Sequence, residues 1–421
     1  MQKIKALISS PSFKSLLIQL SGFGLSFAIS LVLTNIYDAK IYGDYVLVFS
    51  TLDMFAIFSL VGYNQLFSIQ VPKMKTDEEK FGIYKIATKK SLIHCLLISA
   101  CILLFGIFYP FQENTLRYFV FSSAIFLPFI ALTIVNTNFL FSLKETLLTQ
   151  FNDKIIRFVL FIGLILLGSH FTNSIGIIIA AFAVSTLVTY GISYLLRKRR
   201  IDFVKSPIPT PSKFNKTIYL LLTINTINLL FSKSDALQMA YYLGADYAGV
   251  NNVYMKMSQI LHLVMSSSLL IFSPKISKII AQERFDLVRK ELNKVFRFAI
   301  PFSLALLVLV LTLSPLFLSL YKSSIYQAHN YSLTLYCVSA VFGILTGPAA
   351  LILMLSNKLS HLIIGYSIEL LLNLFLNAIL IPRYSIEGAA YATLISELAV
   401  NLYFTYICYR HFKLNTLFFG K

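Results

Sequence analysis

Three charged side chains, Lys233, Asp235 and Lys256, lie inside two long apolar stretches of the sequence. The break between these stretches, residues 242–249, contains two glycines and predicts a turn that folds one helix back on the other as an antiparallel hairpin. Lys233 and Lys256 each lie eleven positions from the fold point, so we expect both ammonium groups at the same depth. In a bilayer, each such charge costs about 2.5 to 3.5 kcal/mol, so it is expected to face a partner or a water-filled cavity.

Uncharged polar residues follow the same two helices. On the second helix, Asn252, Lys256 and Gln259 recur at the spacing of one helical face, and on the first helix Asn228 shares a face with Asp235. Asp53, in an earlier apolar segment, is expected at about the depth of Lys256. These side chains predict a polar binding site, and its candidate residues are Lys256, Lys233, Asp235, Asn252, Gln259, Asn228 and Asp53.

Structural roles are open for the same charges. Asp235 and Lys256 lie close enough in depth to form an interhelical ion pair that only holds the hairpin together. Lys233 could extend its long aliphatic stem towards the membrane interface. His94 and His262 are expected to form hydrogen bonds between helices.

Two glutamates, Glu369 and Glu397, lie deep in the last two apolar segments and are, with Asp53, the candidates for coupling transport to a cation. The sequence contains no GxxxxGK[ST], HExxH, CxxC or GxSxG motif. Its four cysteines fall inside apolar segments and predict neither a disulfide nor a metal site. We therefore expect no enzymatic activity and no cofactor.

The composition is that of an integral membrane protein. Hydrophobic residues make up 57% of the 421, mean hydropathy is +0.75, and only 13% are charged, about half the fraction of soluble domains. Apolar segments of about 20 residues recur along the whole chain, as membrane-spanning helices do. The first of them is too long for a signal-peptide core and is expected to be an uncleaved span.

Twelve spans are predicted, which places both termini on the same side of the membrane. Alternate connections and the two tails hold most of the 36 Lys and Arg residues, whereas the other connections hold four. By the positive-inside rule the basic side is cytoplasmic, so the net charge of +18 reflects topology rather than nucleic-acid binding. The predicted spans cover residues 15–37, 45–68, 91–109, 118–141, 154–169, 175–196, 218–240, 249–273, 298–320, 331–355, 361–380 and 387–408.

One connection, residues 197–217, is strongly basic and contains three prolines, which favours an extended tether. It divides the chain into two six-helix lobes, residues 1–196 and 218–421, and duplicated halves are how many secondary transporters are built. A further basic segment, residues 274–297, has the pattern of an amphipathic helix lying on the membrane surface, or of a solvated connector.

The sequence resembles the polysaccharide flippases of the multidrug/oligosaccharidyl-lipid/polysaccharide exporter superfamily, over nearly all of its length. The resemblance is carried by LTNIYDAKIYGDYVLVFSTLDMFAIFSLVGYNQ at 33–65, by SKSDALQMAYYLGADYAGVNNVYMKMSQI with the later FSPKISKI, and by SNKLSHLIIGYSIELLLNLFLNAILIPRYSIEGAAYATLISE at 356–397. Asn373, Asn377 and Gly388 belong to the last of these, which is the most specific.

The resemblance implies an all-α integral membrane protein with about twelve transmembrane helices in two six-helix lobes around a central cavity. It implies a flippase that moves an undecaprenyl-diphosphate-linked oligosaccharide, such as an O-antigen repeat unit, across the bacterial inner membrane. Lysines of the predicted site would then balance phosphate charge. Related lipid II flippases carry arginines in their first two spans, whereas here these spans carry only Asp53, which disfavours a peptidoglycan precursor as the substrate.

Two other classes are open alternatives. A cation-coupled exporter of drugs or metabolites shares the superfamily fold, and would depend on a carboxylate such as Asp53 or Glu397 rather than on the lysines. A membrane glycan polymerase would require a large external loop with catalytic residues, and the predicted external connections are all short.

Overall fold

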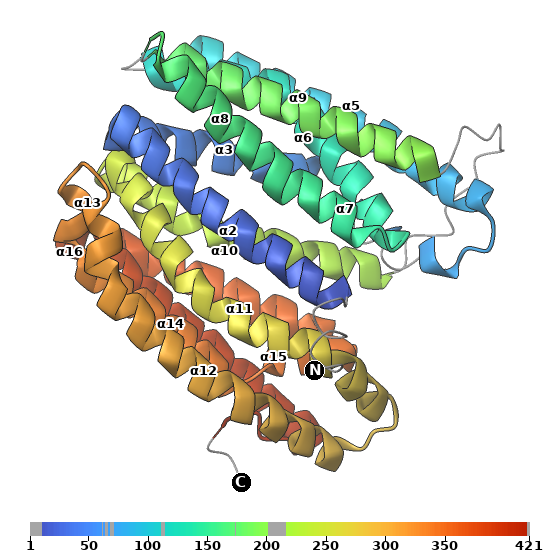
Figure 1. Ribbon diagram of the computed structural model, residues 1–421. Helices are drawn as coiled ribbons and strands as arrows, with labels where there is room; N and C mark the ends of the chain where they lie inside the picture. The colour runs from blue at the N-terminus through green and yellow to red at the C-terminus, as the bar shows by residue number, and fades with distance from the viewer. Residues whose placement is uncertain are drawn as a thin grey trace, which may run out of the picture. The chain divides into compact units, whose positions relative to one another are not determined.

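The computed structural model describes residues 11–60, 62–63, 66–67, 71–110, 114–172, 174–200 and 216–418. The secondary structure of these residues is entirely helical (Figure 1). The helices are α2 (Pro11–Ile36), α3 (Ala39–Ser59), η1 (Val71–Lys73), α5 (Asp77–Phe108), α6 (Asn114–Ser142), α7 (Thr146–Phe151), η2 (Asn152–Ile156), α8 (Arg157–Ser169), α9 (Ile175–Arg200), α10 (Lys216–Tyr242), α11 (Ala245–Ala281), α12 (Phe285–Ser319), α13 (Ile325–Ala328), α14 (Asn330–Thr346), α15 (Ala349–Leu355) and α16 (Leu359–Phe412).

Many of these helices are long and apolar enough to cross a bilayer. Within the described part of the chain, seven qualify by length and composition, or eight if the bent pair α14 and α15 forms one span. Large apolar side chains are exposed along α5 from Ile93 to Phe108, where only lipid would make such exposure favourable. The chain is therefore a multi-pass membrane protein, as its composition predicts.

Polar residues define several helix starts. The Asp38 carboxylate accepts a hydrogen bond of 2.7 Å from the backbone N–H of Ile41 and caps α3. Thr76 caps α5 in the same way, and Asp77 lies in the first turn of that helix, where a carboxylate complements the helix dipole. These caps stop α2 and α3 from merging into one helix and fix where α5 begins.

The fifth predicted span begins earlier than expected. Helices α7, η2 and α8 follow one another without a break from Thr146 to Ser169, and Figure 1 shows α7 and α8 on one continuous ribbon. At 1.5 Å per residue these 24 residues are about 36 Å long, enough to span a bilayer. The prediction that this span starts at residue 154 is wrong, because the apolar run alone defined it and the helix extends through the polar residues before it.

Helix α16 contains 54 residues, which is far too long for one crossing. Ser385 has a φ of 55° and a ψ of −135°, so the helical path breaks there. Contacts between its two arms pair His361 with His411 and Asn373 with Thr393, as in an antiparallel hairpin. The arms of α16 coincide with the last two predicted spans.

The basic segment 274–297 does not form a separate surface helix. Its first part completes α11 and its second part begins α12, with a break at residues 282–284. Ile276, Leu292 and Val295 are buried in the protein instead of facing lipid. The prediction of an interfacial helix was wrong because the apolar positions that suggested it pack between neighbouring helices.

The chain divides into two compact units, Met1–Leu222 and Thr223–Lys421. In the first, α6 packs against α3, α5 and α9, and α2 packs against α8. In the second, α11 packs against α12 and α14, and α14 packs against α16. The predicted linker, residues 197–217, begins inside α9 and ends in α10, and its residues 201–215 lie outside the described part. The division into lobes of 1–196 and 218–421 stays a prediction.

Candidate functional site

The hairpin of α10 and α11 positions the two lysines of the second unit. Gly244 turns the chain with a φ of 116°, a backbone conformation that favours glycine. Lys233 lies nine residues before the end of α10, and Lys256 lies eleven residues after the start of α11. At 1.5 Å per residue, both lie about 14 to 16 Å from the turn. Their charges are close enough to interact, and both side chains are half-buried.

Asp235 lies in a buried hydrogen-bond network with α16. Its Oδ1 accepts hydrogen bonds from Nδ2 of Asn377 at 2.7 Å and from Nδ2 of Asn373 at 3.1 Å. Its Oδ2 accepts a hydrogen bond of 2.6 Å from Oγ1 of Thr393. Ser234 donates to Oδ1 of Asn373 at 2.6 Å, which fixes the orientation of that amide. All five side chains are buried.

This network bears on the ion pair predicted between Asp235 and Lys256, and a role of Asp235 in substrate binding stays a prediction. In the described part of the chain, the hydrogen-bond donors to its carboxylate come from both arms of α16, and Lys256 is not among them. Asp235 therefore joins α10 to the last two spans rather than closing the α10–α11 hairpin. Three donors compensate much of the cost of burying a carboxylate.

Two further carboxylates lie one helical turn along the same hairpin. Glu369 precedes Asn373 by four residues, and Glu397 follows Thr393 by four, so the pair lies across the hairpin from one another and their charges interact. Ser339 of α14 donates a hydrogen bond to Oε2 of Glu397. The charge of Glu397 also interacts with Asp235 and with His262 of α11.

Such a cluster is suited to taking up a proton. Nearby carboxylates repel one another in a low-dielectric interior, so protonation relieves that repulsion. The described residues contain no group of three His, Cys, Asp or Glu side chains arranged to hold a metal ion. The cluster comprises Asp235, Glu369 and Glu397, with Asn373, Asn377, Thr393 and Ser339 as its hydrogen-bond donors.

The remaining predicted residues of the second unit lie on the same two helices. Asn252 and Gln259 flank Lys256 on α11, and the side chain of Gln259 is exposed. Asn228 forms a hydrogen bond with the hydroxyl of Tyr366, on the first arm of α16. The stripe predicted from helical spacing is therefore present on α11, whereas Asn228 is engaged in an interhelical contact.

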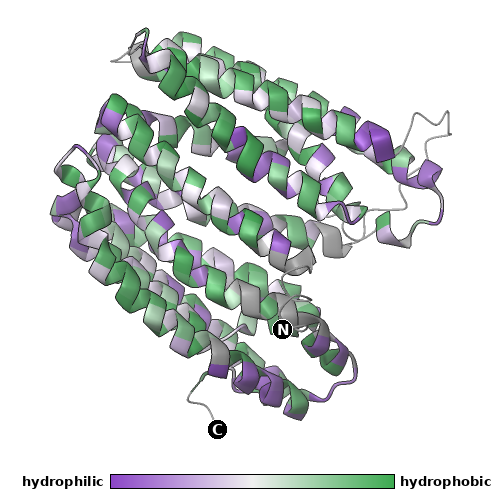
Figure 2. Cartoon of the chain, in the orientation of Figure 1, coloured by the Kyte–Doolittle hydropathy of each residue, from purple (hydrophilic) through white to green (hydrophobic). Residues whose placement is uncertain are grey.

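Asp53 lies in the first unit, exposed on α3, together with charges that the sequence analysis did not single out. The buried hydroxyl of Tyr45 interacts electrostatically with Asp53 and with Arg157 of α8. Asp153 and Lys154 belong to η2, the π-helical turn immediately before Arg157. Figure 2 shows this hydrophilic stretch part-way along an otherwise apolar helix.

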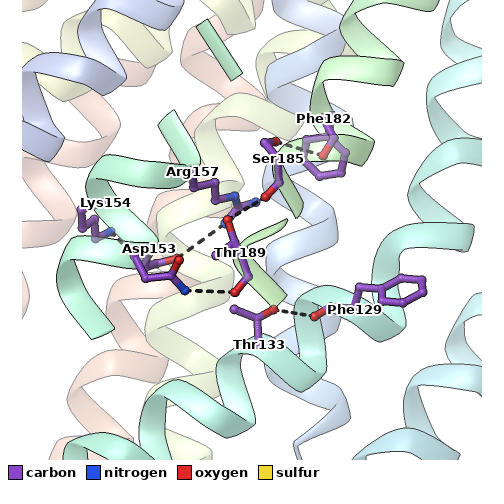
Figure 3. Close-up of polar contacts among 9 residues, drawn as sticks. Phe129, Thr133, Asp153, Lys154, Arg157, Phe182, Ser185 and Thr189 are labelled. Carbon is purple, nitrogen blue, oxygen red and sulfur yellow. Dashed lines mark hydrogen bonds and ion pairs between the residues drawn. The ribbon is translucent and has the colours of Figure 1, made fainter. Parts of the chain in front are cut away.

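The side chains of this turn are shown in Figure 3. Oδ1 of Asp153 lies 3.8 Å from the Arg157 guanidinium, and Oδ2 lies 3.9 Å from the Lys154 ammonium. Nδ2 of Asn152 donates a hydrogen bond of 3.0 Å to the backbone oxygen of Thr189, which anchors the turn to α9. The signal available in the sequence was the run NDKIIR next to a span that was only 16 residues long as predicted.

The family model for polysaccharide biosynthesis proteins matches residues 12–280, which is more than half of the chain. The chain belongs to the polysaccharide biosynthesis protein family. The resemblance to polysaccharide biosynthesis proteins found in the sequence is thereby confirmed. No curated protein matches the chain.

Several solved structures of transporters share the fold of this chain. The lipid II flippase MurJ in an inward closed conformation matches with a TM-score of 0.70 at 14% identity, over 93% of this chain and 87% of that one. The MATE multidrug transporter DinF-BH matches with a TM-score of 0.70 at 14% identity, over 99% and 97%. A MOP superfamily transporter from Pyrococcus furiosus matches with a TM-score of 0.65 at 12% identity, over 96% and 94%.

Proposed function

We propose that this transporter is a flippase that moves an undecaprenyl-diphosphate-linked oligosaccharide from the inner to the outer leaflet of the bacterial cytoplasmic membrane. The observation that carries the proposal is the pair Lys233 and Lys256, two cations half-buried at matched depths of one helical hairpin. Their like charges interact and repel one another. An anionic substrate relieves that repulsion.

A diphosphate carrying several sugars is polyanionic and strongly hydrated, so its passage requires cations and hydrogen-bonding groups. In the proposed site, Lys256 and Lys233 balance phosphate charge, and Asn252 and Gln259 offer hydrogen bonds to sugar hydroxyls. The polyprenyl tail stays in the surrounding lipid. The cargo in this proposal is a repeat unit of O-antigen or of another surface polysaccharide, passed on to glycan polymerase or other assembly proteins, as in lipopolysaccharide biosynthesis.

The proposed mechanism is alternating access by two six-helix lobes, with both termini in the cytoplasm. The proposal counts twelve spans by taking α7 to α8 as one span, α14 with α15 as one, and each arm of α16 as one. The coupling ion in this proposal is H⁺, which binds at Glu369 or Glu397, whose charges interact across the α16 hairpin in the second unit. Binding there changes how tightly the α16 hairpin is held to α10 through Asp235.

The proposal is tested by mass spectrometry of polyprenyl-diphosphate lipids from cells that lack the gene. We expect a complete, unpolymerised oligosaccharide to accumulate on the carrier lipid and surface glycan to disappear. Parental protein and Lys256→Arg should restore export, because arginine keeps the cation. The double variant Lys233→Ala with Lys256→Ala should lower export at least about tenfold, which corresponds to a loss of about 1.4 kcal/mol or more of transition-state stabilisation. An unchanged lipid profile with intact surface glycan, in a strain without a second flippase, would reject the proposal.

The second candidate function is a cation-coupled exporter of small amphiphilic drugs or metabolites. It is favoured by the cluster of three carboxylates, which is sufficient for coupling without any role for the lysines. In that case the double lysine variant keeps its transport activity, while Glu397→Gln abolishes it. Drug-resistance assays on these two variants separate the two functions.

A further inference from the structure

The π-helical turn η2 places three charges near the middle of a membrane-spanning helix. The backbone N–H of Arg157 donates to the carbonyl oxygen of Asn152, five residues earlier, which is the bond of a π turn. Arg157 is the twelfth of the 24 residues from Thr146 to Ser169. Such turns occur mostly at functional sites, and charges at this depth are costly unless they serve one.

One carboxylate faces two cations at this turn, and it holds neither tightly. The separations of 3.8 Å to Arg157 and 3.9 Å to Lys154 exceed the 2.7 to 2.9 Å of a charge-assisted hydrogen bond. For comparison, the amine of Lys80 lies 2.8 Å from Asp77. The Lys154 side chain is 48% exposed and that of Arg157 is 22% exposed, so an incoming anion can reach both.

The rest of the turn holds these side chains in place. The Arg157 guanidinium lies over the ring of Phe182 at 5.9 Å, and the Phe182 ring contacts that of Phe49 in a tilted arrangement, with 4.0 Å between the ring centroids. On the other side, α2 approaches so closely that a Cβ at Gly22 would lie 2.7 Å from Cβ of Lys154. The amide of Asn152 ties the turn to α9. The two cations are therefore presented from a fixed backbone, which lowers the entropy lost on binding a ligand.

We propose that Lys154 and Arg157 form a second phosphate-binding site, in the first unit, for the diphosphate of the lipid-linked substrate. A diphosphate offers more acceptor oxygens than Asp153, and a guanidinium can bind two of them at once. On binding, the diphosphate replaces the Asp153 carboxylate as the main partner of both cations. The identity of this ligand rests on the proposed flippase function, whereas the site itself rests on the geometry of the turn.

Native mass spectrometry of the purified full-length protein tests the site, because it separates bound lipids by mass. The protein is incubated with an equimolar mixture of undecaprenyl diphosphate and phosphatidylglycerol. We expect Lys154→Gln with Arg157→Gln to weaken binding of undecaprenyl diphosphate at least about tenfold, while Arg117→Gln, which removes an exposed arginine elsewhere in this unit, leaves it unchanged.

Asp153→Asn is the decisive variant, because misfolding cannot imitate its expected effect. Removing the competing carboxylate should tighten binding of undecaprenyl diphosphate several-fold. The site is refuted if the double variant and Asp153→Asn both bind undecaprenyl diphosphate as the parental protein does while Lys256→Gln weakens this binding. That outcome would still be consistent with the proposed flippase function. The site is also refuted if binding of phosphatidylglycerol depends on Lys154 and Arg157 as strongly as binding of undecaprenyl diphosphate does. The ligand of the two cations would then be a phospholipid headgroup. If the parental protein binds no undecaprenyl diphosphate, the proposed function fails together with this inference.

Discussion

A carboxylate buried among helices is stable only when hydrogen-bond donors surround it, and Asp235 has three. Two of these donors come from the first arm of α16, and the third, Thr393, comes from the second arm. The same residue therefore fixes the position of α10 against both arms. Replacing Thr393 by valine removes the hydrogen bond to this carboxylate and the weaker one from Asn373 while changing the shape of the side chain little.

We predict that Thr393→Val destabilises the protein by about 1 to 3 kcal/mol, the usual result of leaving a buried polar atom without its partner. Thermal unfolding in detergent measures this, followed by a thiol-reactive dye that detects the buried Cys337 and Cys408 as they become exposed. Thr312→Val is the matched control, because the Thr312 hydroxyl is exposed and bonds only to backbone oxygens of its own helix. Equal unfolding midpoints for the two variants would contradict the role assigned to Thr393.

Residue types and helical spacing predicted the depth of Lys233 and Lys256, since both follow from distance to the turn along the chain. The partners of Asp235 were not predictable in this way, because Asn373 and Asn377 lie about 140 residues later and contacts between distant helices depend on the fold. Asn373 and Asn377 did stand out in the most family-specific stretch. The motif marked them as important without saying what they bind.

Among the elements, α16 shows how one turn makes two spans. Ser385 breaks the helix, and Gly388 then lies so close to the carbonyl oxygen of Leu380 that a side chain at this position would overlap the backbone. A backbone atom cannot move aside as the end of a flexible side chain can. The close approach is what brings Asn373 opposite Thr393, and so it also shapes the Asp235 network.

Gly388→Ala should therefore destabilise the protein by about 1 to 3 kcal/mol through overpacking. A matched control is Gly343→Ala in α14, where an added Cβ would meet no atom within 4 Å. Alanine is better than glycine in a helix by about 0.5 to 1 kcal/mol, so the control should unfold at the same or a slightly higher temperature. The same thiol-dye measurement compares the two variants, and a Gly388→Ala protein as stable as the control would show that the turn tolerates a side chain.

Apolar length predicted most elements well, because a run of about 20 apolar residues has few alternatives to a transmembrane helix. It failed where a helix carries charges, as from Thr146 to Ile156, since hydropathy assigns polar residues to loops. It failed again at residues 274–297, where periodicity identified an apolar face but not what covers that face. The π turn itself has no sequence signal, because it depends on how η2 packs against α2 and α9.

For the whole molecule, the sequence predicts two six-helix lobes, and each compact unit contains a helical hairpin near its start. Polar groups are present in both units, with the lysine pair and carboxylates in the second and the π turn in the first. The arrangement of charge between the two membrane sides is a property of the whole chain, because it follows from every connection together.

The cytoplasmic location of the basic connections can be tested with a matched pair of single-cysteine variants. Gln282 lies in the connection between α11 and α12, and Gln327 lies in α13, between α12 and α14; both are exposed. Both variants are made in a background without the four native cysteines, and a membrane-impermeant maleimide is applied to cells with an intact cytoplasmic membrane. We expect it to label Gln327→Cys and to leave Gln282→Cys unlabelled. The reason is that α12 separates the two positions and the Lys and Arg bias predicts that Gln282 is cytoplasmic. Both should react equally once that membrane is permeabilised. Labelling of Gln282→Cys alone in intact cells would show that the topology is the opposite of the one predicted. The side of the chain that receives the substrate in the proposed function would then have to be exchanged with the side that releases it.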